Sequence, residues 1–543
     1  MKNSTTFIFL FLISFRAIAQ LPAFEWANQC GNPPNTTDAK TSLASGQDGE
    51  LYLAGEFLDT ARFGNKVLVA AGGIDIFLVK YTAEGNVLWT NRIGAADDDY
   101  TQKIVVDNEG SVIVTGYFYG LIQIGQDQYT SYGSQDVFIA KYDSEGDFLW
   151  SYRAGGMMAD YITGLAFDNE QNLVISGYFY DAITFDDTTL YSSSSSDVYL
   201  AKFDADGELL WVTSAGGSSS DQVRSVSCDP DGNVLVSGSF YYDITLGDTT
   251  LSTMDPAGVF IAKYFPDGLL DQAFQLNGTY LTPEVYIKAG EEGDFYISGN
   301  FSEQVVFGNK TFNAGEFNQD IYTAKYDPTC KLQWARHAYS YASDQVMGIE
   351  TDSYNNLYLT GHYLDSIHFD LLSLPYTLCC GSREIFIVSY SAAGDVLWGD
   401  QITGTRANIQ SVAMNGQDEL VLSGLFTEEV IMGPLMLSHF EGFQNYVTCL
   451  RTEVFTSVNR DLNMKALKVF PNPASERIQI MTGANEVHYG YSIYSINGFL
   501  IASGNVNING NIDVGFLPSG TYYLRLNQPD EGSQSHSCLF IKQ

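Results

Sequence analysis

Acidic residues recur about every 61 residues along the middle of the chain, each just before a stretch of alternating apolar and polar residues. They are Asp38, Asp99, Asp160, Asp221, Glu284 and Asp344, with Asn408 at the seventh position. If they gather at one mouth of a central channel, they predict a site for a cation or a polar ligand. The alternative is that each carboxylate caps backbone amides of its own loop, as aspartate commonly does.

Pairs of tyrosines follow a repeated glycine in three of the same units, at Tyr117/Tyr119, Tyr178/Tyr180 and Tyr241/Tyr242. Aromatic faces beside carboxylates suit a saccharide ring, which has an apolar face and a polar rim. Packing between the repeated units is the alternative. The candidate ligand-binding residues are therefore Tyr119, Tyr180, Tyr242, Asp99, Asp160 and Asp221.

Short Asp-rich turns occur in the same units, for example at residues 107–110, 168–171 and 229–232. Such turns can ligate Ca²⁺ through oxygen atoms, although none has the twelve-residue loop that ends in glutamate. Tight hairpin turns explain most of them equally well. We expect no resident cofactor, and Ca²⁺ is the one ion that these turns could hold.

The chain has seven cysteines, an odd number that leaves the disulfide connectivity open. Cys30 and Cys449 fall on two strands that we expect to pair, which makes them candidates for a disulfide. The adjacent Cys379 and Cys380 lie in an enlarged loop of the sixth unit and are candidates for a vicinal disulfide.

No catalytic motif stands in a suitable context. The six histidines show no clustering typical of a metal site, and there is no Gly-x-Ser-x-Gly elbow, phosphate-binding loop or dinucleotide fingerprint. We assign no catalytic and no metal-ligating residue, and we expect the protein not to be an enzyme.

The residues named so far belong to seven copies of one unit. The marker is a strand that ends in glycine followed closely by an aromatic residue, at Gly55, Gly116, Gly177, Gly238, Gly299, Gly361 and Gly424. Each unit contains about four segments with period-2 alternation, which indicates strands. Seven four-stranded units predict a seven-bladed β-propeller, because radial closure leaves only short protected sheet edges.

All six tryptophans occupy one repeat position, and Phe274 is expected to hold that position where the tryptophan is missing. The repeat fits a packing role between blades. Trp26 precedes the first full unit, so we expect the strand at residues 24–27 to complete the last blade. The region resembles a bacterial β-propeller repeat family with a signature seen at Asp75–Tyr81, Asp136–Tyr142 and Asp197–Phe203. That resemblance implies the fold and no defined reaction.

Both ends of the chain have features of targeting signals. Residues 1–19 combine Lys2, a nine-residue apolar stretch and an Ala-Ile-Ala cleavage site, which predicts a signal peptide. No other stretch approaches 18 apolar residues, so we expect no transmembrane helix. The last part of the chain alternates with period 2 between turns, which predicts a small Ig-like β-sandwich.

That last part also resembles the type A C-terminal sorting domain of the type IX secretion system of Bacteroidota. Four blocks fall in the order of the family: Pro471-Asn472-Pro473, Ile496-Asn497-Gly498, residues 517–522 and Ile541-Lys542-Gln543. The resemblance implies export to the outer-membrane surface or beyond, with the secretion machinery as a partner of residues 465–543. The expected organisation is a signal peptide (1–19), a seven-bladed propeller (20–452), a linker (453–464) and the sorting domain (465–543).

The formal net charge is −37, which disfavours binding to nucleic acid or to anionic membranes. We expect an exported or cell-surface protein, non-enzymatic, that binds a protein or a glycan. The alternatives are a polysaccharide-active hydrolase or lyase on the same scaffold, and a purely structural component of the cell envelope.

Overall fold

The protein, seen here as a computed structural model, is built of β-strands in two compact units, one spanning Pro22–Glu453 and the other containing Val454–Gln543. The structure describes residues 22–30, 40–46, 48–254, 257–315, 318–377, 383–404, 406–452, 468–470, 476–481, 488–495, 500–507, 511–515, 517, 520–527 and 536–542. The expected signal peptide, Asp38, Cys379 and Cys380 lie outside the described residues.

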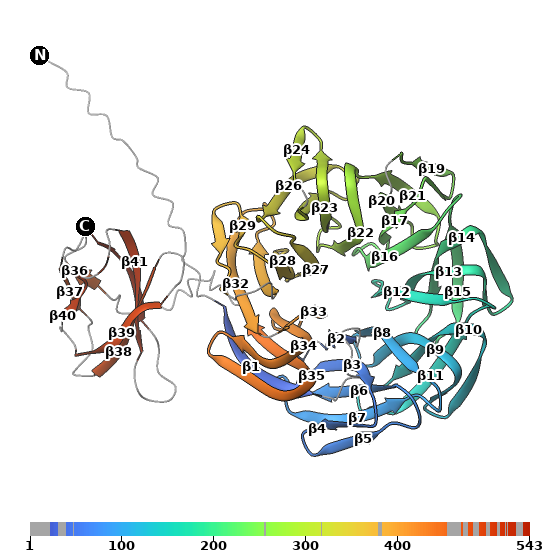
Figure 1. Ribbon diagram of the computed structural model, residues 1–543, viewed down its shortest axis with the longest axis horizontal. Helices are drawn as coiled ribbons and strands as arrows, with labels where there is room; N and C mark the ends of the chain where they lie inside the picture. The colour runs from blue at the N-terminus through green and yellow to red at the C-terminus, as the bar shows by residue number, and fades with distance from the viewer. Residues whose placement is uncertain are drawn as a thin grey trace, which may run out of the picture. The chain divides into compact units, whose positions relative to one another are not determined.

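The larger unit is a ring of seven antiparallel blades (Figure 1). Blade 1 consists of β2 (Thr41–Ser45), β3 (Leu51–Phe57), β6 (Asp75–Tyr81) and β7 (Val87–Ile93), with the hairpin β4 (Thr60–Phe63) and β5 (Lys66–Val69). Blade 2 consists of β8 (Asp99–Val106), β9 (Val112–Ile124), β10 (Asp127–Tyr142) and β11 (Phe148–Ala154). Blade 3 consists of β12 (Asp160–Phe167), β13 (Leu173–Phe185), β14 (Thr188–Phe203) and β15 (Leu209–Ala215). Blade 4 consists of β16 (Asp221–Cys228), β17 (Val234–Phe240), β20 (Gly258–Tyr264) and β21 (Leu270–Gln275), with the hairpin β18 (Asp243–Leu246) and β19 (Thr249–Ser252).

The remaining three blades follow the same order from the axis outward. Blade 5 consists of β22 (Asn277–Ala289), β23 (Phe295–Phe307), β25 (Asp320–Tyr326) and β26 (Leu332–Tyr339), and β24 (Lys310–Asn313) pairs with β23. Blade 6 consists of β27 (Gln345–Thr351), β28 (Leu357–Tyr363), β31 (Glu384–Tyr390) and β32 (Val396–Gly404). The hairpin of β29 (Ile367–Phe369) and β30 (Leu372–Leu374) follows β28 in the chain, and its β29 pairs with β26 of blade 5. Blade 7 consists of β33 (Ser411–Met414), β34 (Glu419–Met432), β35 (Leu435–Arg451) and β1 (Ala23–Cys30).

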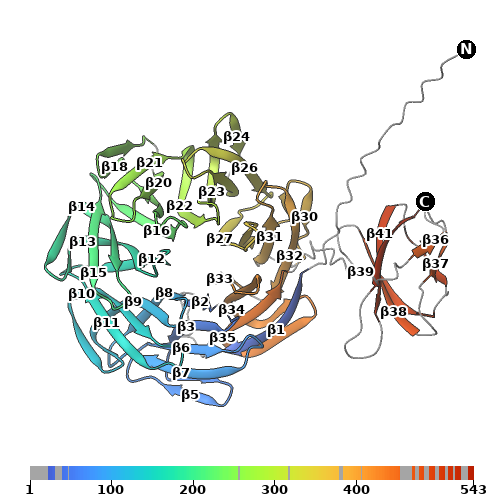
Figure 2. The same cartoon turned by 180° about the vertical axis from the view of Figure 1, so that it is seen from behind.

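The ring closes at both its inner and its outer edge. The first strand of each blade contacts the first strand of the next, and β33 of blade 7 contacts β2 of blade 1 (Figures 1 and 2). At the outer edge β1, from the start of the chain, pairs antiparallel with β35 from the end of the propeller. This is the strand that the repeat phase assigns to the last blade. The all-β class and the seven-bladed propeller expected from the sequence are confirmed.

The repeated glycine has a steric cause. In each blade it lies in the second strand, directly beneath an aromatic ring of the third strand, and both strands are buried on their two faces. A Cβ atom at Gly55 would stand 2.4 Å from Cζ of Phe77, and one at Gly116 would stand 2.7 Å from Cε1 of Phe138. No real Cβ tolerates that distance, so only glycine lets the ring pack flat on the neighbouring strand.

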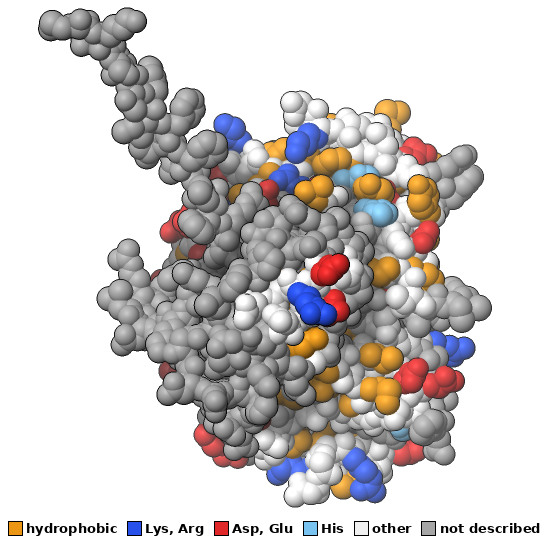
Figure 3. Space-filling model, turned by 90° about the vertical axis from the view of Figure 1, so that its left-hand side faces the viewer, with side chains coloured by type: hydrophobic (Ala, Val, Ile, Leu, Met, Phe, Trp, Pro, Cys, Tyr) orange, Lys and Arg blue, Asp and Glu red, His pale blue; other side chains and the backbone are white. Residues whose placement is uncertain are grey.

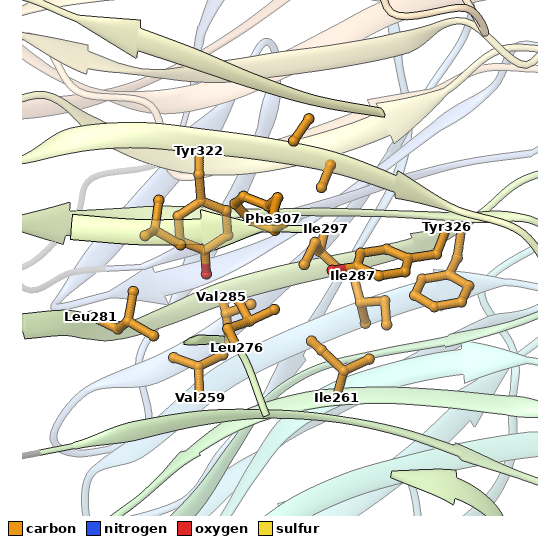
Figure 4. Close-up of a cluster of buried hydrophobic side chains, with 14 of the residues drawn as sticks. Val259, Ile261, Leu276, Leu281, Val285, Ile287, Ile297, Phe307, Tyr322 and Tyr326 are labelled. Carbon is orange, nitrogen blue, oxygen red and sulfur yellow. The ribbon is translucent and has the colours of Figure 1, made fainter. Parts of the chain in front are cut away.

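The hydrophobic core is divided among the interfaces between blades. Between blades 4 and 5 it contains Val259 and Ile261 of β20, Val285 and Ile287 of β22, and the ring of Tyr322 of β25 (Figure 4). Each of these side chains is at least 98% buried. Because the same interface recurs around the ring, every blade is held mainly by its two neighbours.

The smaller unit contains two antiparallel sheets. One comprises β36 (Lys468–Phe470), β37 (Arg477–Met481) and β40 (Asn511–Asp513), and the other comprises β39 (Leu500–Asn507), β38 (His488–Ser495), β41 (Gly520–Asn527) and β42 (His536–Lys542). Ile478, Ile493 and Leu524 are fully buried. This is the small sandwich expected from the sequence.

Candidate functional site

The tryptophans join neighbouring blades, as their repetition predicts. The indole Nε1 of Trp150 on β11 donates a hydrogen bond to the carbonyl of Ala205, which lies in a turn of blade 3, at 3.1 Å. Lys141 on β10 donates to the same carbonyl at 3.2 Å and forms an ion pair with Asp107 of its own blade. We call this arrangement of tryptophan, lysine and shared carbonyl the inter-blade clasp.

The clasp also requires a glycine. Trp150 packs on Gly207, whose φ is 86°, and a Cβ atom there would lie 2.8 Å from Cδ2 of the indole. The same tryptophan–glycine contact recurs at Trp26/Gly85, Trp89/Gly146, Trp211/Gly268 and Trp334/Gly394.

Phe274 does not take the place of the missing tryptophan, contrary to the prediction from the sequence. Lys141 lies opposite Trp150 in blade 2, whereas the equivalent Lys263 lies opposite Gln272 in blade 4. Phe274 stands two residues further along the same face, where it packs on the ring of Tyr326 with centroids 5.3 Å apart. In the next blade the clasp glycine is also replaced, by Cys330 with a φ of 59°. Tryptophan and glycine are therefore lost together.

The Asp-rich turns are filled by the protein's own groups. Oδ1 of Asp107 accepts hydrogen bonds from the backbone amides of Glu109 and Ser111, and Oδ2 pairs with Lys141 at 3.0 Å. Asp168 and Asp229 make the same contacts, with Lys202 and Lys263. The turns thus act as hairpin caps whose outer oxygen binds a lysine of the clasp. Among the described residues, no group of three or more His, Cys, Asp or Glu side chains could hold a metal ion.

The recurring aspartates lie between blades rather than on an open surface. Asp99, Asp160 and Asp221 have no exposed surface, and Oδ2 of each accepts the backbone amide four residues earlier, at 2.8 to 3.0 Å. The observed hydrogen bonds of Asp99, Asp160 and Asp221 are therefore those of residues that cap backbone amides of their own loop.

A second buried acid faces each of these aspartates from the preceding blade. The pairs are Asp75/Asp99, Asp136/Asp160, Asp197/Asp221 and Asp320/Asp344, and we call them the carboxylate pairs. In the first, a Cβ atom at Gly94 would lie 2.7 Å from Oδ1 of Asp75 and 2.8 Å from Oδ2 of Asp99. Burial is the main cause, and the charge of the paired carboxylate a lesser one, that raises the pKa of Asp99, Asp160, Asp221 and Asp344 to about 8.

Six tyrosines form a continuous row across blades 2 and 3. In the order in which their rings contact one another they are Tyr119, Tyr100, Tyr117, Tyr161, Tyr178 and Tyr180, with successive ring centroids 4.7 to 6.3 Å apart. Tyr100 lies directly opposite Tyr117 on β8 and β9, and Tyr161 opposite Tyr178 on β12 and β13. β8 and β12 are the strands at the inner edge of the ring (Figure 2). We call this set the tyrosine row.

The tyrosine row is partly exposed and has a polar border. Tyr119 is 38% exposed, and its hydroxyl donates a hydrogen bond to Oε1 of Gln135. Burial and the nearby carboxylates of Asp98 and Glu56 raise the pKa of Tyr100 to about 12, so its hydroxyl stays protonated at neutral pH. At the other end, burial raises the pKa of Tyr178 to about 12.

The row therefore unites two of the three predicted tyrosines, Tyr119 and Tyr180, and adds four that the sequence argument did not select. Tyr100 and Tyr161 were missed although each directly follows one of the recurring aspartates, which was the available signal. Tyr242 lies in a turn of blade 4 with a φ of 68° and is 66% exposed. It makes no ring contact with the row among the described residues.

The row is specific to two blades. In blade 1 the position of Tyr117 is taken by Glu56, and in blade 4 by Ser239, as the strand registers show. A structural requirement would recur around the ring like the clasp. Figure 3 shows hydrophobic, acidic and basic side chains interspersed among the described residues that face the viewer.

Cys30 and Cys449 are free thiols, which corrects the predicted disulfide. The strands do pair, but Cys449 lies opposite Trp26 and Cys30 lies opposite Asn445. The two cysteines are thus four residues apart along the ladder, roughly 13 Å at the rise of a strand. A disulfide requires Cα atoms no more than about 7 Å apart.

Comparison with known proteins identifies the smaller unit. Residues 468–541 match the secretion system C-terminal sorting domain. Over 456 residues the chain is 26% identical to an uncharacterized WD repeat-containing protein of Acanthamoeba polyphaga mimivirus, covering 69% of this chain and 33% of that protein. It is 28% identical over 215 residues to the regulatory protein FlaEY of Caulobacter vibrioides, covering 38% of this chain and 22% of that protein. The chain thus spans about a third or less of the length of these relatives.

Among solved structures, a protein of unknown function from Dyadobacter fermentans aligns with a TM-score of 0.36 and 10% identity, over 80% of this chain and 98% of that one. A puromycin hydrolase aligns with a TM-score of 0.34 and 8% identity, over 72% of this chain and 58% of that one. No helix among the described residues has the length and hydropathy needed to span a membrane. The protein is a seven-bladed β-propeller that ends in a type IX secretion sorting domain, and that domain directs it to the cell surface or the extracellular space.

Proposed function

We propose that the protein is a non-enzymatic binding protein of the cell surface or exterior, and that it holds a glycan on the tyrosine row. The observation that carries the proposal is the restriction of the row to blades 2 and 3, while the packing residues of the clasp recur around the ring. A packing requirement that comes from the fold recurs from blade to blade, whereas a surface that binds a ligand can be confined to a few blades.

The chemistry of the row suits a saccharide. Tyrosine rings offer a flat apolar face to the C–H groups of a sugar, and their hydroxyls offer hydrogen bonds at the rim. The six rings form a continuous aromatic strip whose successive centroids lie 4.7 to 6.3 Å apart, and the length of this strip favours an extended chain over a single small molecule. Sorting to the cell exterior gives the protein access to such chains.

The test is a glycan-array screen of the whole chain, followed by titration of the best ligand against two variants. Tyr119→Ala and Tyr180→Ala each remove one partly exposed ring from an end of the row. Loss of one stacking contact of about 1–1.5 kcal/mol corresponds to a roughly tenfold weaker affinity. Tyr191→Ala is the matched control, because Tyr191 is 74% exposed on blade 3 and outside the row.

Binding that survives both row variants at full strength would refute the assignment of the row. If the folded protein binds no glycan and instead captures a protein ligand that depends on Tyr119, the row remains the site and the ligand class is overturned.

A further inference from the structure

The inner strands of blades 2, 3, 4 and 6 share a β-bulge directly after the residue that lies opposite the repeated glycine. The extra residue is Gln102 on β8, Thr163 on β12, Arg224 on β16 and Met347 on β27. A bulge re-aims the side chain of its extra residue and leaves that residue outside the ladder. Because uncharged side chains of three kinds occupy the same position, the packing of the strand does not require an arginine there.

The protein supplies no partner for the charge of Arg224. Its side chain is half-buried, and its Nε is buried without a hydrogen-bond partner. Among the described residues, no carboxylate lies within ion-pair distance of the guanidinium, not even that of Glu284 on the neighbouring strand β22, and no aromatic ring stacks on it. The chain has 64 acidic and only 27 basic residues, so carboxylates are abundant. An unpaired, half-buried arginine in such a chain suits an anion from outside it.

Arg224 lies beside the tyrosine row. Thr163 of β12 donates a hydrogen bond to the carbonyl of Val223 on β16 at 2.9 Å, which joins the inner strands of blades 3 and 4. The positive charge of Arg224 acts on Tyr178 of the row, where it opposes the rise in pKa that burial causes. It acts in the same way on Tyr286 of blade 5. Both rings are therefore close enough to the guanidinium to sense its charge.

The two ends of the row differ in charge. The carboxylates of Asp98 and Glu56 act on Tyr100, near one end, whereas the guanidinium of Arg224 acts on Tyr178, near the other. A ligand that lies along the row therefore meets negative charge at one end and positive charge at the other.

A second unpaired cation lies on the inner strands. The basic residues of these strands are Lys103 on β8, Arg224, and Lys288 on β22. Lys288 pairs with Glu350 at 2.6 Å, whereas Lys103 has no ion pair with a described carboxylate. Water reaches Lys103, but the surrounding ring limits the solvation of its amine and so lowers its pKa, and the charge of Lys40 is a lesser cause. The inner edge of the ring thus favours an anion.

We propose that the glycan on the tyrosine row is acidic and that Arg224 binds its carboxylate or sulfate group. This inference rests on the proposed function, because it names the class of glycan for the same row. A guanidinium presents a planar fork of N–H donors that fits two oxygen atoms of either group. The acidic sugar unit lies over Tyr178, away from Asp98 and Glu56. The net charge of −37 does not prevent this contact, since exposed charges beyond about 8 Å are largely screened at physiological ionic strength.

The experiment screens the whole chain against an array of polysaccharides in physiological salt. Polygalacturonate, alginate and hyaluronate supply carboxylates, carrageenan and dextran sulfate supply sulfate esters, and laminarin, xylan and mannan are neutral. We expect binding to at least one acidic polymer, and binding weaker by about tenfold or more to its neutral form, obtained by methyl esterification or desulfation. The acidic polymer that binds identifies the anion as a carboxylate or a sulfate.

Two variants then test the arginine by titration with the bound polymer. Arg224→Gln removes the charge, and Arg224→Lys keeps the charge but removes the fork. Arg62→Gln is the matched control, because Arg62 is exposed on β4 of blade 1, outside the row. We expect Arg224→Gln to weaken binding by about tenfold or more and to reduce its salt dependence, and Arg224→Lys to weaken it less. Neither should lower the unfolding temperature, since Arg224 has no partner to lose, and Arg62→Gln should change nothing.

The outcomes separate this inference from the proposed function. Binding of neutral polymers alone, weakened by Tyr180→Ala, supports the proposed function and overturns the acidic ligand. Binding of an acidic polymer that weakens in Tyr180→Ala but not in Arg224→Gln overturns the role of Arg224. If the folded chain binds no polysaccharide of the array, the proposed function and this inference both fail.

Discussion

The defective clasp between blades 4 and 5 allows a quantitative test of why tryptophan and glycine recur together. Between blades 4 and 5 the tryptophan position holds Gln272 and the glycine position holds Cys330. Gln272→Trp alone places an indole against a Cβ atom, where the intact clasps leave 2.7 to 2.9 Å between the indole and the point at which a Cβ would stand. Overpacking of this kind costs about 1–3 kcal/mol of unfolding free energy.

Cys330→Gly alone relieves a left-handed backbone conformation, worth about 1–2 kcal/mol, but also removes a side chain packed on the core, so its net effect is close to zero. In the double variant the overpacking disappears. The indole can then donate to the carbonyl of Pro328, which already accepts Lys263 at 3.2 Å, and such a bond contributes about 1 kcal/mol. The two changes should therefore couple favourably by about 2–3 kcal/mol.

The assay is a double-mutant cycle from urea unfolding followed by circular dichroism, with hydrogen exchange of the β21 and β26 amides as a local readout. A reverse cycle of Trp150→Gln and Gly207→Cys at an intact clasp is the control, and it should show coupling of the same sign. Additivity within about 0.5 kcal/mol in both cycles would refute the steric explanation.

Three further predictions concern charge and burial. Lys202→Met should cost about 3–5 kcal/mol in urea unfolding, because it leaves Asp168 buried without its partner, whereas Lys288→Met at a half-exposed ion pair should cost under about 1 kcal/mol; equal costs would contradict this. In chelator, stability should rise as the pH falls from 8.5 to 5.5, because the four inner aspartates with pKa raised to about 8 bind more protons folded than unfolded; a fall in the urea midpoint would contradict it. The thiols of Cys30, Cys228, Cys330 and Cys449 should resist a thiol reagent at pH 8 until the protein unfolds, since burial raises their pKa values, to about 12 for Cys30; rapid labelling of these four in folded protein would contradict this.

The architecture could be predicted from the sequence because the same sequence signals recur in each blade of the propeller. Gly55 and its copies recur at nearly constant spacing since each must pass beneath an aromatic ring, and that steric demand is the same in every blade. The repeated tryptophan position likewise predicted a contact between neighbouring blades.

Register was the part that the pattern did not determine. The disulfide between Cys30 and Cys449 failed by four residues along a ladder whose strand pairing was correctly expected. Phe274 was misplaced by two residues because both positions point to the same face of β21. Alternation identifies a face, but only the ladder itself specifies which residue lies opposite which.

Contacts between blades were the other missing element. Each recurring aspartate was visible as a repeat, but its partner belongs to the third strand of the preceding unit, for example Asp75 for Asp99. The tyrosine row likewise depends on the contact of Tyr117 with Tyr161 across two blades.

The pairing of β1 with β35 affects the order in which the molecule assembles. The hydroxyl of Thr448 donates a hydrogen bond to the carbonyl of Trp26, 422 residues away in the chain. The strand β1 therefore cannot pair until β35, at the other end of the propeller sequence, is present. The entropy of closing so large a loop grows only logarithmically with length, yet such non-local pairing slows folding. Until it occurs, β35 has an open edge that another chain could occupy. A circular permutant that places residues 22–30 directly after β35 turns this closure into a local hairpin, and it should fold faster than the natural order without altering a single contact of the finished ring.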